Sequence, residues 1–556
     1  MKRFLAVVMF LVISSSFAYA GWFPISAWGI KQDSEQDTVW VDSAEVWLGN
    51  SIGISNRGYD INGAFLDKAE NDTIKVFFMG LVYDGYVPLP IMARAQFSTY
   101  QSEAHDSSMC YMPGYFDSSC IGDSVYDNLA SNNYAWRVRV DSNTAGYMQT
   151  ELSQHKGHRQ EFVTFPYFHD TLMYEARFYL RIPNTTDQQE NKPVCKISVW
   201  RKDTVYSLLD SLTLYRSSFS DTNAYETFSL WFQKDISMVT AYGRDWSPMD
   251  YRIYWYDNYD LYADKIEVRD TVYYNLEEGY YNTPITNTVT YWNQYPALAY
   301  YFLWDEPNLD QFDAFYRVKY RMGSDAKPIT CVSPRYKGEY GYNHYIDFIK
   351  TCYAGDDETP LLVDEYALNP GDTTVSAIQN KFSYLCAWMD SVREIADTTG
   401  PGNPHRPVWY FCQAHSWRKI TSGGDTVYVH RDPTPEEEWA IIGLGLAYGA
   451  KGILPFEYNS RYYSNGSIRI HGLMDYDFEN SIWKRNGKWY ATRNVNAVLE
   501  KVDTFLLDFE FQNAFSGGDA PQNYIKSTSF DTTEFGLFED SDDLKYFLVV
   551  SRRDTF

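Results

Sequence analysis

Two patterns of apolar and polar residues succeed one another along this chain. Short apolar runs at 22–28, 51–57 and 74–79 are typical of buried parallel strands, and residues 61–70 between the last two have apolar side chains at helical spacing. From about residue 88 to residue 273 the pattern changes to short alternating segments separated by turn residues, clearest in Met173–Arg181. Alternation with a period of two favours antiparallel strands.

Apolar runs and helical segments alternate again after residue 280. Helices are predicted at 284–294, 311–321, 344–353, 375–396, 434–449 and 494–506. Strands are predicted at 297–304, 328–332, 361–366, 407–413 and 452–458, which brings the count to eight with the first three. We therefore predict an α/β fold: a (β/α)8 TIM barrel interrupted by an antiparallel β-sandwich, and the start of a C-terminal β module.

The N-terminus reads as a secretory signal peptide. Lys2 and Arg3 precede an apolar segment at 4–13, and Ala18-Tyr19-Ala20 resembles a cleavage site. No other run is long and apolar enough to span a bilayer. We predict that the protein is secreted, or lies in the periplasm or at the cell surface. The predicted divisions are a signal peptide at 1–20, barrel parts at 21–87 and 274–507, an inserted sandwich at 88–273 and the C-terminal module at 508–556.

Composition narrows the class of partner. The net charge of -25 is spread along the chain, which speaks against nucleic acid or anionic lipid as a ligand. Aromatic residues make up 18% of the chain, and 49 of them are tyrosines. Amphipathic rings suit the apolar faces and hydroxyls of a poly- or oligosaccharide, although Tyr is also common on strands of extracellular proteins. The nine His and seven Cys have no metal-ligand spacing, so we expect no metal and no cofactor.

The apolar run 298–304 stops abruptly on Asp305, Glu306 and Pro307. A buried parallel strand ends in this way where it delivers acidic groups to the rim of a barrel. The stretch resembles the Asn-Glu-Pro signature that ends the fourth strand in many TIM-barrel glycoside hydrolases, with Asp305 in place of Asn. The resemblance implies that Glu306 is the general acid/base. The segment 431–458 resembles the last helix and strand of sugar-processing barrels, and 88–273 resembles jelly-roll carbohydrate-binding modules.

A glycosidase needs a second carboxylate, and the sequence leaves its identity open. In the family that the chain resembles, a Glu ends the seventh strand, but here that strand ends in Gln413. Asp364, Glu365 and Glu457 are the alternatives, although Glu365 could cap a loop and Glu457 could pair with Arg461 or Lys451. The candidate catalytic residues are therefore Asp305, Glu306, Asp364, Glu365 and Glu457. The candidate substrate-binding residues, all near strand ends, are Trp28, Asn56, Arg57, Tyr366, Gln413, His415, Trp417 and Tyr458.

Three classes of function fit these features. The leading hypothesis is a secreted, carbohydrate-active O-glycoside hydrolase. The alternative is a non-catalytic glycan-binding protein with a degenerate barrel, which the missing carboxylate at Gln413 favours. In a third class, a structural or surface-layer protein, the barrel would be incidental. Fold resemblance alone does not establish activity.

Overall fold

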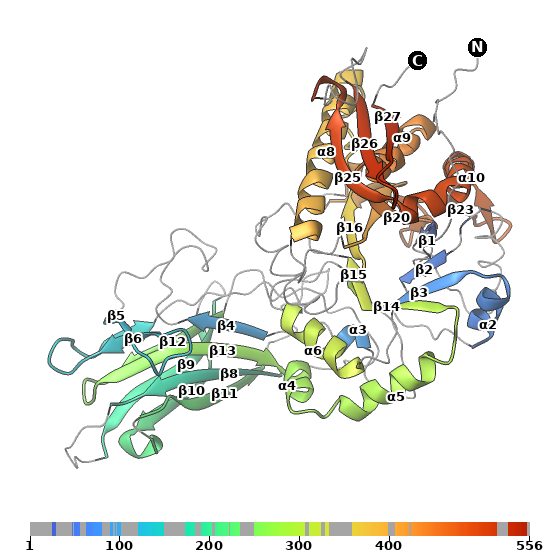
Figure 1. Cartoon of the computed structure of the whole chain (residues 1–556). Coiled ribbons are helices and arrows are strands. Elements are labelled where there is room, and N and C mark those ends of the chain that lie inside the picture. Colours follow the sequence, from blue (N-terminus) through green and yellow to red (C-terminus); the bar gives the residue numbers. More distant parts are fainter. Residues whose placement is uncertain are drawn as a thin grey trace, which may run out of the picture. The chain divides into compact units, whose positions relative to one another are not determined.

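The computed structural model describes 25–28, 47, 49, 51–55, 63–79, 89–92, 95, 97–101, 121–149, 173–183, 191–202, 206–221, 223–233, 249–305, 311–323, 329–332, 359–398, 406–421, 424–519 and 532–552 (Figure 1). The chain divides into two compact units. Unit 1 comprises Met1–Pro90, Thr286–Pro307 and Met322–Phe556, and unit 2 comprises Ile91–Ile285 and Asn308–Arg321. The predicted signal peptide lies outside the described residues, and the predicted domain boundaries remain predictions.

Unit 1 contains an eight-stranded parallel sheet with the order β1-β2-β3-β14-β15-β16-β17-β20. A parallel bridge between Ile25 and Ile453 also links the first and last of these strands. The strands are β1 Ser26–Trp28, β2 Ser51–Ser55, β3 Lys75–Met79, β14 Leu298–Asp305, β15 Ile329–Val332, β16 Leu361–Glu365, β17 Val408–Gln413 and β20 Ala450–Phe456. Sequence order and spatial order therefore agree, so the carboxyl ends of these strands lie at one edge.

Alternate residues on one face of this sheet form a common apolar cluster. Phe302, Leu362, Trp409, Phe411 and Leu454 are buried there, and Tyr300 and Phe456 pack against them. Strands that contribute two residues contribute them two positions apart, as in the pairs 300/302, 409/411 and 454/456. This spacing is expected because strand side chains alternate between the two faces of a sheet.

The other described elements are helices and smaller antiparallel sheets. The helices are α2 Gly63–Asn71, α3 Leu89–Met92, α4 Thr271–Glu277, α5 Asn282–Trp292, α6 Phe312–Met322, α8 Val375–Thr398, α9 Pro435–Ala447 and α10 Gly487–Asp508. The smaller sheets of unit 1 contain β18 Ser416–Ile420, β19 Thr426–His430, β21 Arg461–Tyr462, β22 Ile468–His471, β23 Met474–Asp477, β24 Ile482–Arg485, β25 Glu510–Ser516, β26 Thr533–Glu539 and β27 Lys545–Ser551.

The start of α9 follows directly from its sequence. Thr434 is the N-cap and accepts a hydrogen bond from the Glu437 N–H, while the Glu437 carboxylate accepts one from the Thr434 N–H at 2.8 Å. Pro435 occupies the first turn, where its missing N–H costs nothing. The Thr-Pro-Glu-Glu-Glu pattern predicts Thr434 as the N-cap with Pro435 in the first turn, and both are confirmed; the reciprocal contact with Glu437 makes the cap a capping box.

The predicted fold class, a (β/α)8 barrel with an inserted sandwich, is wrong. In the part of the chain that the structure describes, 42% of residues are in strands and 31% in helices, and these strands form several sheets instead of an eight-fold β/α repeat. Antiparallel strands occupy connections where the repeat would have only a helix: β18 and β19 lie between β17 and α9, and β21 to β24 lie between β20 and α10. These segments are rich in aromatic and β-branched residues, which pair readily as short strands.

Unit 2 contains two antiparallel sheets that enclose one apolar core. On β8, Tyr174, Ala176, Phe178 and Leu180 are buried in that core, so the alternation seen in the sequence is the alternation between its two faces. The strands are β4 Phe97–Gln101, β5 Asp123–Tyr126, β6 Tyr134–Val138, β7 Gly146–Gln149, β8 Met173–Arg181, β9 Pro193–Lys202, β10 Tyr206–Tyr215, β11 Glu226–Gln233, β12 Met249–Trp255 and β13 Leu261–Asp270.

Candidate functional site

Five rings gather at the carboxyl ends of β16, β17 and β20, and we call Tyr366, His415, Trp417, His430 and Phe456 the aromatic cluster. Tyr366 stacks on Phe456 with ring centroids 5.5 Å apart and lies edge-on to His415 at 4.7 Å. Trp417 stacks on His430 at 6.1 Å, and His430 is 5.7 Å from both Tyr366 and His415. All but His415 are partly exposed. Such half-buried rings present flat apolar faces to a ligand.

His415 is the buried centre of this cluster, with 1% of its surface exposed. Its Nδ1 is 2.8 Å from the carbonyl oxygen of Phe456. Because a carbonyl only accepts, the proton must be on Nδ1, and Nε2 then carries the lone pair. Burial, with His430 nearby, lowers the pKa of His415 to about 3. A neutral imidazole with this tautomer offers a hydrogen-bond acceptor.

Gln413 ends β17 at the position where the resemblance predicts a carboxylate. Its side chain is 1% exposed and fully engaged. The Nε2 group donates to the carbonyl oxygens of Arg431 at 2.9 Å, Leu368 at 3.3 Å and His415 at 3.3 Å, and Oε1 accepts from the Leu368 N–H at 2.8 Å. Gln413 therefore joins the segments that carry the cluster, and its own polar atoms already have protein partners.

The two carboxylates that end β16 differ in their place on the sheet. Asp364 is two residues after Leu362 and opposite Phe411, both of which pack in the apolar cluster of the sheet face. Glu365 is opposite Cys412, on the face of Tyr410. The Tyr410 ring lies against Gly445 of α9 and near Trp388 of α8. Alternation therefore places Asp364 on the face of the sheet that carries the apolar cluster and Glu365 on the face that packs against the helices.

Glu457 follows β20 and is fully buried, with 0% of its surface exposed. Its carboxylate binds the guanidinium of Arg461 in a paired contact four residues away. The peptide bond between Phe456 and Glu457 is cis. Lys451, the other partner considered for Glu457, binds backbone carbonyls of Leu506 and Phe509 instead. The carboxylate of Glu457 is thus committed to an ion pair.

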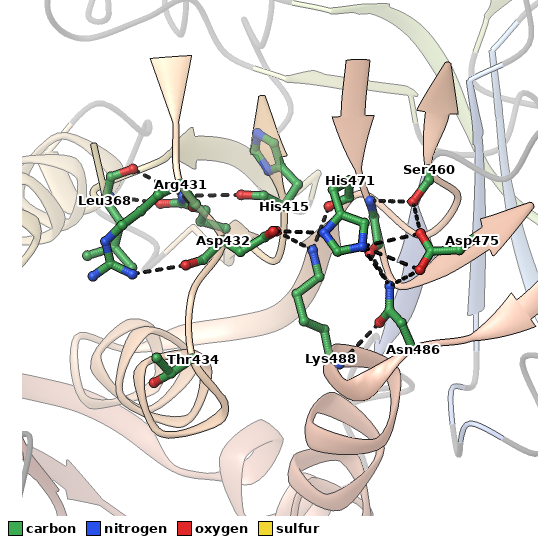
Figure 2. A network of polar contacts seen from close by, with 12 residues as sticks. Leu368, His415, Arg431, Asp432, Thr434, Ser460, His471, Asp475, Asn486 and Lys488 are labelled. Atoms are coloured by element: carbon green, nitrogen blue, oxygen red, sulfur yellow. Dashed lines mark hydrogen bonds and ion pairs between the residues drawn. The ribbon is translucent and has the colours of Figure 1, made fainter. Parts of the chain in front are cut away.

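An ionic network lies beside the aromatic cluster (Figure 2). His471 Nδ1 is 2.7 Å from an Asp432 oxygen, and its Nε2 is 3.3 Å from Asp475. Asp432 also accepts from Lys488 Nζ at 2.5 Å, and Asp475 accepts from Ser460 at 2.7 Å. Asp432 follows His430 by two residues, and His471 pairs with Ser416 across the strands β18 and β22. The network therefore connects the strands that carry the aromatic cluster to the start of α10.

The charges of this network shift one another. Burial by itself lowers the pKa of His471, but the hydrogen bonds to Asp432 and Asp475 outweigh it and raise that pKa. Burial likewise works against ionised Asp432, yet His471 and Lys488 bring its pKa below the ordinary value. On α9, burial raises the pKa of Glu438 well above its ordinary value, and neither carboxylate oxygen has a hydrogen-bond partner among the described residues. Glu438 is thus a buried carboxyl group whose charged form is disfavoured, near the charges of Lys488 and Asp432.

The remaining predicted site residues are distributed as follows. Glu306, Asn56 and Arg57 lie outside the described residues. Trp28 and Asp305 end β1 and β14, with only their backbones described. Tyr458 is fully buried, accepts a hydrogen bond from Trp489 Nε1 at 3.0 Å and lies edge-on to Trp47. The structure brings together Tyr366, Gln413, His415 and Trp417 and places Tyr458 in a separate apolar environment.

Sequence reasoning missed three residues of this region: His430, Asp432 and His471. Phe456, next to Glu457 in the sequence, already suggests a wall for a sugar ring. His430 ends a strand of the β18–β19 hairpin, and the regular spacing of Trp417 and His430 about a turn at Gly424 was the available signal. The Asp432–His471 contact joins residues 39 apart, which no local pattern reveals.

Comparisons with known proteins give no family for this chain. No family model matches it, and no curated protein matches it. Solved structures similar to parts of it include the mannohexaose complex of the carbohydrate-binding module CBM27-1 of Caldicellulosiruptor saccharolyticus, at 11% identity and a TM-score of 0.20, covering 31% of this chain and 96% of that chain. The family 51 α-L-arabinofuranosidase AbfB of Bifidobacterium longum matches at 9% identity and a TM-score of 0.28, covering 46% of this chain and 53% of that chain.

A β-glucuronidase of Faecalibacterium prausnitzii matches at 10% identity and a TM-score of 0.26, covering 59% of this chain and 66% of that chain. The structural neighbours thus include glycoside hydrolases and a carbohydrate-binding module, but likenesses this weak establish neither family nor activity. Within the described part of the chain, none of the helices combines the length and apolar character needed to cross a bilayer.

Proposed function

We propose that this protein is carbohydrate-active and binds a sugar chain at the carboxyl edge of the eight-stranded parallel sheet of unit 1. One observation carries the proposal: the half-buried rings of Tyr366, Phe456 and Trp417 lie at the strand ends, next to a neutral hydrogen-bond acceptor at His415. Flat apolar faces beside polar groups match the C–H faces and hydroxyls of a sugar ring.

The finer part of the proposal is hydrolysis of an O-glycosidic bond. Glu306 follows Asp305, the last residue of β14, and takes the role of general acid/base. Among the alternatives for the second carboxylate, Asp364 is favoured because alternation places it on the cluster side of the sheet, whereas Glu457 is paired with Arg461. Two carboxyl groups are the minimum for this chemistry.

The test is release of reducing sugar from mannan, arabinan, xylan, glucuronoxylan and cello-oligosaccharides. Glu306→Gln and Asp364→Asn are each expected to lower the rate by about 10²–10⁴-fold, the usual contribution of an acid or base. Glu365→Gln is the matched control, since its carboxylate is adjacent in sequence but on the helix side, and it is expected to stay within about threefold of wild type. Equal turnover by Glu306→Gln and wild type would remove Glu306 from the mechanism.

A second candidate function is glycan binding without cleavage. It is favoured by Gln413 and Glu457, because two strand ends that could supply a carboxylate instead carry a hydrogen-bonded amide and an ion-paired acid. Binding of a polysaccharide in a glycan array, with no release of reducing sugar from the same material, supports this alternative. Retention of no glycan at all would refute both functions.

Secretion is part of the proposal and rests on the sequence of residues 1–20. If the signal peptide is processed, the N-terminal residue of the mature protein is Gly21 or a close neighbour. Edman sequencing of protein collected from the culture medium or the periplasm tests this, and an intact Met1 in material recovered only from the cytoplasm would refute it.

A further inference from the structure

Gln413 occupies a strand end where a second carboxylate was expected, and its amide is bound on every side. Three backbone carbonyls share its two N–H groups, and its oxygen accepts the Leu368 N–H. Both N–H donors of this buried amide are therefore occupied, and its oxygen already accepts a hydrogen bond from the backbone.

The backbone partners of Gln413 belong to the two flanks of the aromatic cluster. Leu368 is two residues after Tyr366, and Arg431 directly follows His430. Figure 2 shows Leu368, His415 and Arg431 converging beside Asp432. Two further hydrogen bonds join the same segments: the Arg431 N–H to the Leu368 carbonyl at 3.4 Å, and Arg431 Nε to the Asp372 carbonyl at 2.8 Å. Gln413 is the side chain that contacts both flanks and the central His415.

We propose that Gln413 is a positioning residue, which holds Tyr366 and His430 in edge-to-face contact so that the aromatic cluster presents one continuous surface to a sugar, and which supplies no chemistry itself. The inference rests on the proposed function and deepens it. Tyr366 and His430 come from different connections, so their spacing of 5.7 Å depends on bonds between those connections. Buried neutral hydrogen bonds hold the connecting segments firmly in place, because breaking any of them leaves a buried carbonyl or N–H without a partner.

The test compares Gln413→Met, which keeps the length of the side chain but loses every hydrogen bond, with wild type. The probes are mannohexaose, xylohexaose and cellohexaose, and the measurement is the dissociation constant by isothermal titration calorimetry. We expect Gln413→Met to weaken binding by about tenfold, as the loss of one or two hydrogen bonds of ordinary strength gives. The matched control is Asn496→Leu, which removes another fully buried amide, one that donates to the Trp47 carbonyl at 3.1 Å. It should lower the melting temperature with a dissociation constant within about twofold of wild type.

Two readouts separate positioning from a general loss of stability. If Gln413 acts through Tyr366, the double variant Gln413→Met/Tyr366→Ala binds no more weakly than Tyr366→Ala alone. In Gln413→Glu the carboxylate faces three carbonyls, so binding should be weak at pH 8 and recover at pH 5, where a protonated carboxyl group donates again. This second variant keeps the acceptor for the Leu368 N–H and serves if Gln413→Met does not fold.

The outcomes distinguish this inference from the function on which it rests. Wild type that binds none of the three probes and no material in the glycan array overturns the proposed function. Wild type that binds, together with Gln413→Met binding equally well, leaves the function standing and overturns the positioning role. Losses that multiply in the double variant also overturn it.

Discussion

Lowering the pH from 7 to 5 is expected to loosen the end of β17, because His415 is kept neutral in the folded protein. Burial lowers the pKa of His415 to about 3, whereas an imidazole in an unfolded chain has a pKa of about 6.5. Between these values the unfolded state binds more protons than the folded state, so stability falls as the pH falls. The contribution of His415 is complete above about pH 6.5 and is lost progressively below it.

The magnitude follows from this difference. Between pH 7 and pH 5, proton binding to the imidazole favours the unfolded state by a factor of about 25, because the folded imidazole stays almost entirely neutral. This factor lowers the free energy of unfolding by about 2 kcal/mol. Hydrogen exchange measured by mass spectrometry on peptides covering 408–421 reports this local free energy after correction for the intrinsic rate at each pH. Local measurement is required because a chain of this size need not unfold in one step.

The matched variant is His415→Gln, whose neutral amide can still donate to the Phe456 carbonyl that His415 Nδ1 contacts. We expect the protection of residues 408–421 to fall about 25-fold in wild type and by no more than about threefold in His415→Gln. All other titrating groups are common to both proteins and cancel in the comparison. An equal fall in both proteins would refute the assignment of the acid sensitivity to His415.

Two further predictions concern packing and charge. Gly445→Ala should lower the free energy of unfolding by about 1–3 kcal/mol, because a Cβ there would lie 2.6 Å from the buried ring of Tyr410. Gly487→Ala is the control and should change it by less than about 0.5 kcal/mol, since a Cβ there would have no atom within 4 Å. Calorimetric melting of both variants checks this, and equal melting temperatures would contradict it. Asp432→Asn should bring the raised pKa of His471 down toward the ordinary value of about 6.5, since the hydrogen bond to Asp432 is the largest of the causes that raise this pKa. The test is an NMR titration of His471. A midpoint equal to that of wild type would show that another group stabilises the protonated imidazole.

Short-range patterns predicted the local elements well. The strand at Met173–Arg181 and the cap of α9 at Thr434 both follow from residues that are close in sequence, since pleat periodicity and N-capping involve only neighbours. The helix 344–353, by contrast, was predicted in residues that the structure does not describe. The fold class failed because every connection after a strand was assumed to contain only a helix, whereas the segments after β17 and β20 pair as short antiparallel strands.

The sequence by itself determined the strands of the parallel sheet, the helices near 375–396 and 434–449, the N-cap of α9 and the polar residues that follow the strand ends, because these depend on periodicity and on contacts between near neighbours. Only the tertiary structure decided which polar groups have partners. It selected Arg461 over Lys451 as the partner of Glu457, engaged Gln413 with backbone groups up to 45 residues away and brought His471 to Asp432. For Gln413 and His471 the partner comes from another connection when the chain folds, so the sequence alone does not distinguish a free polar side chain from an engaged one.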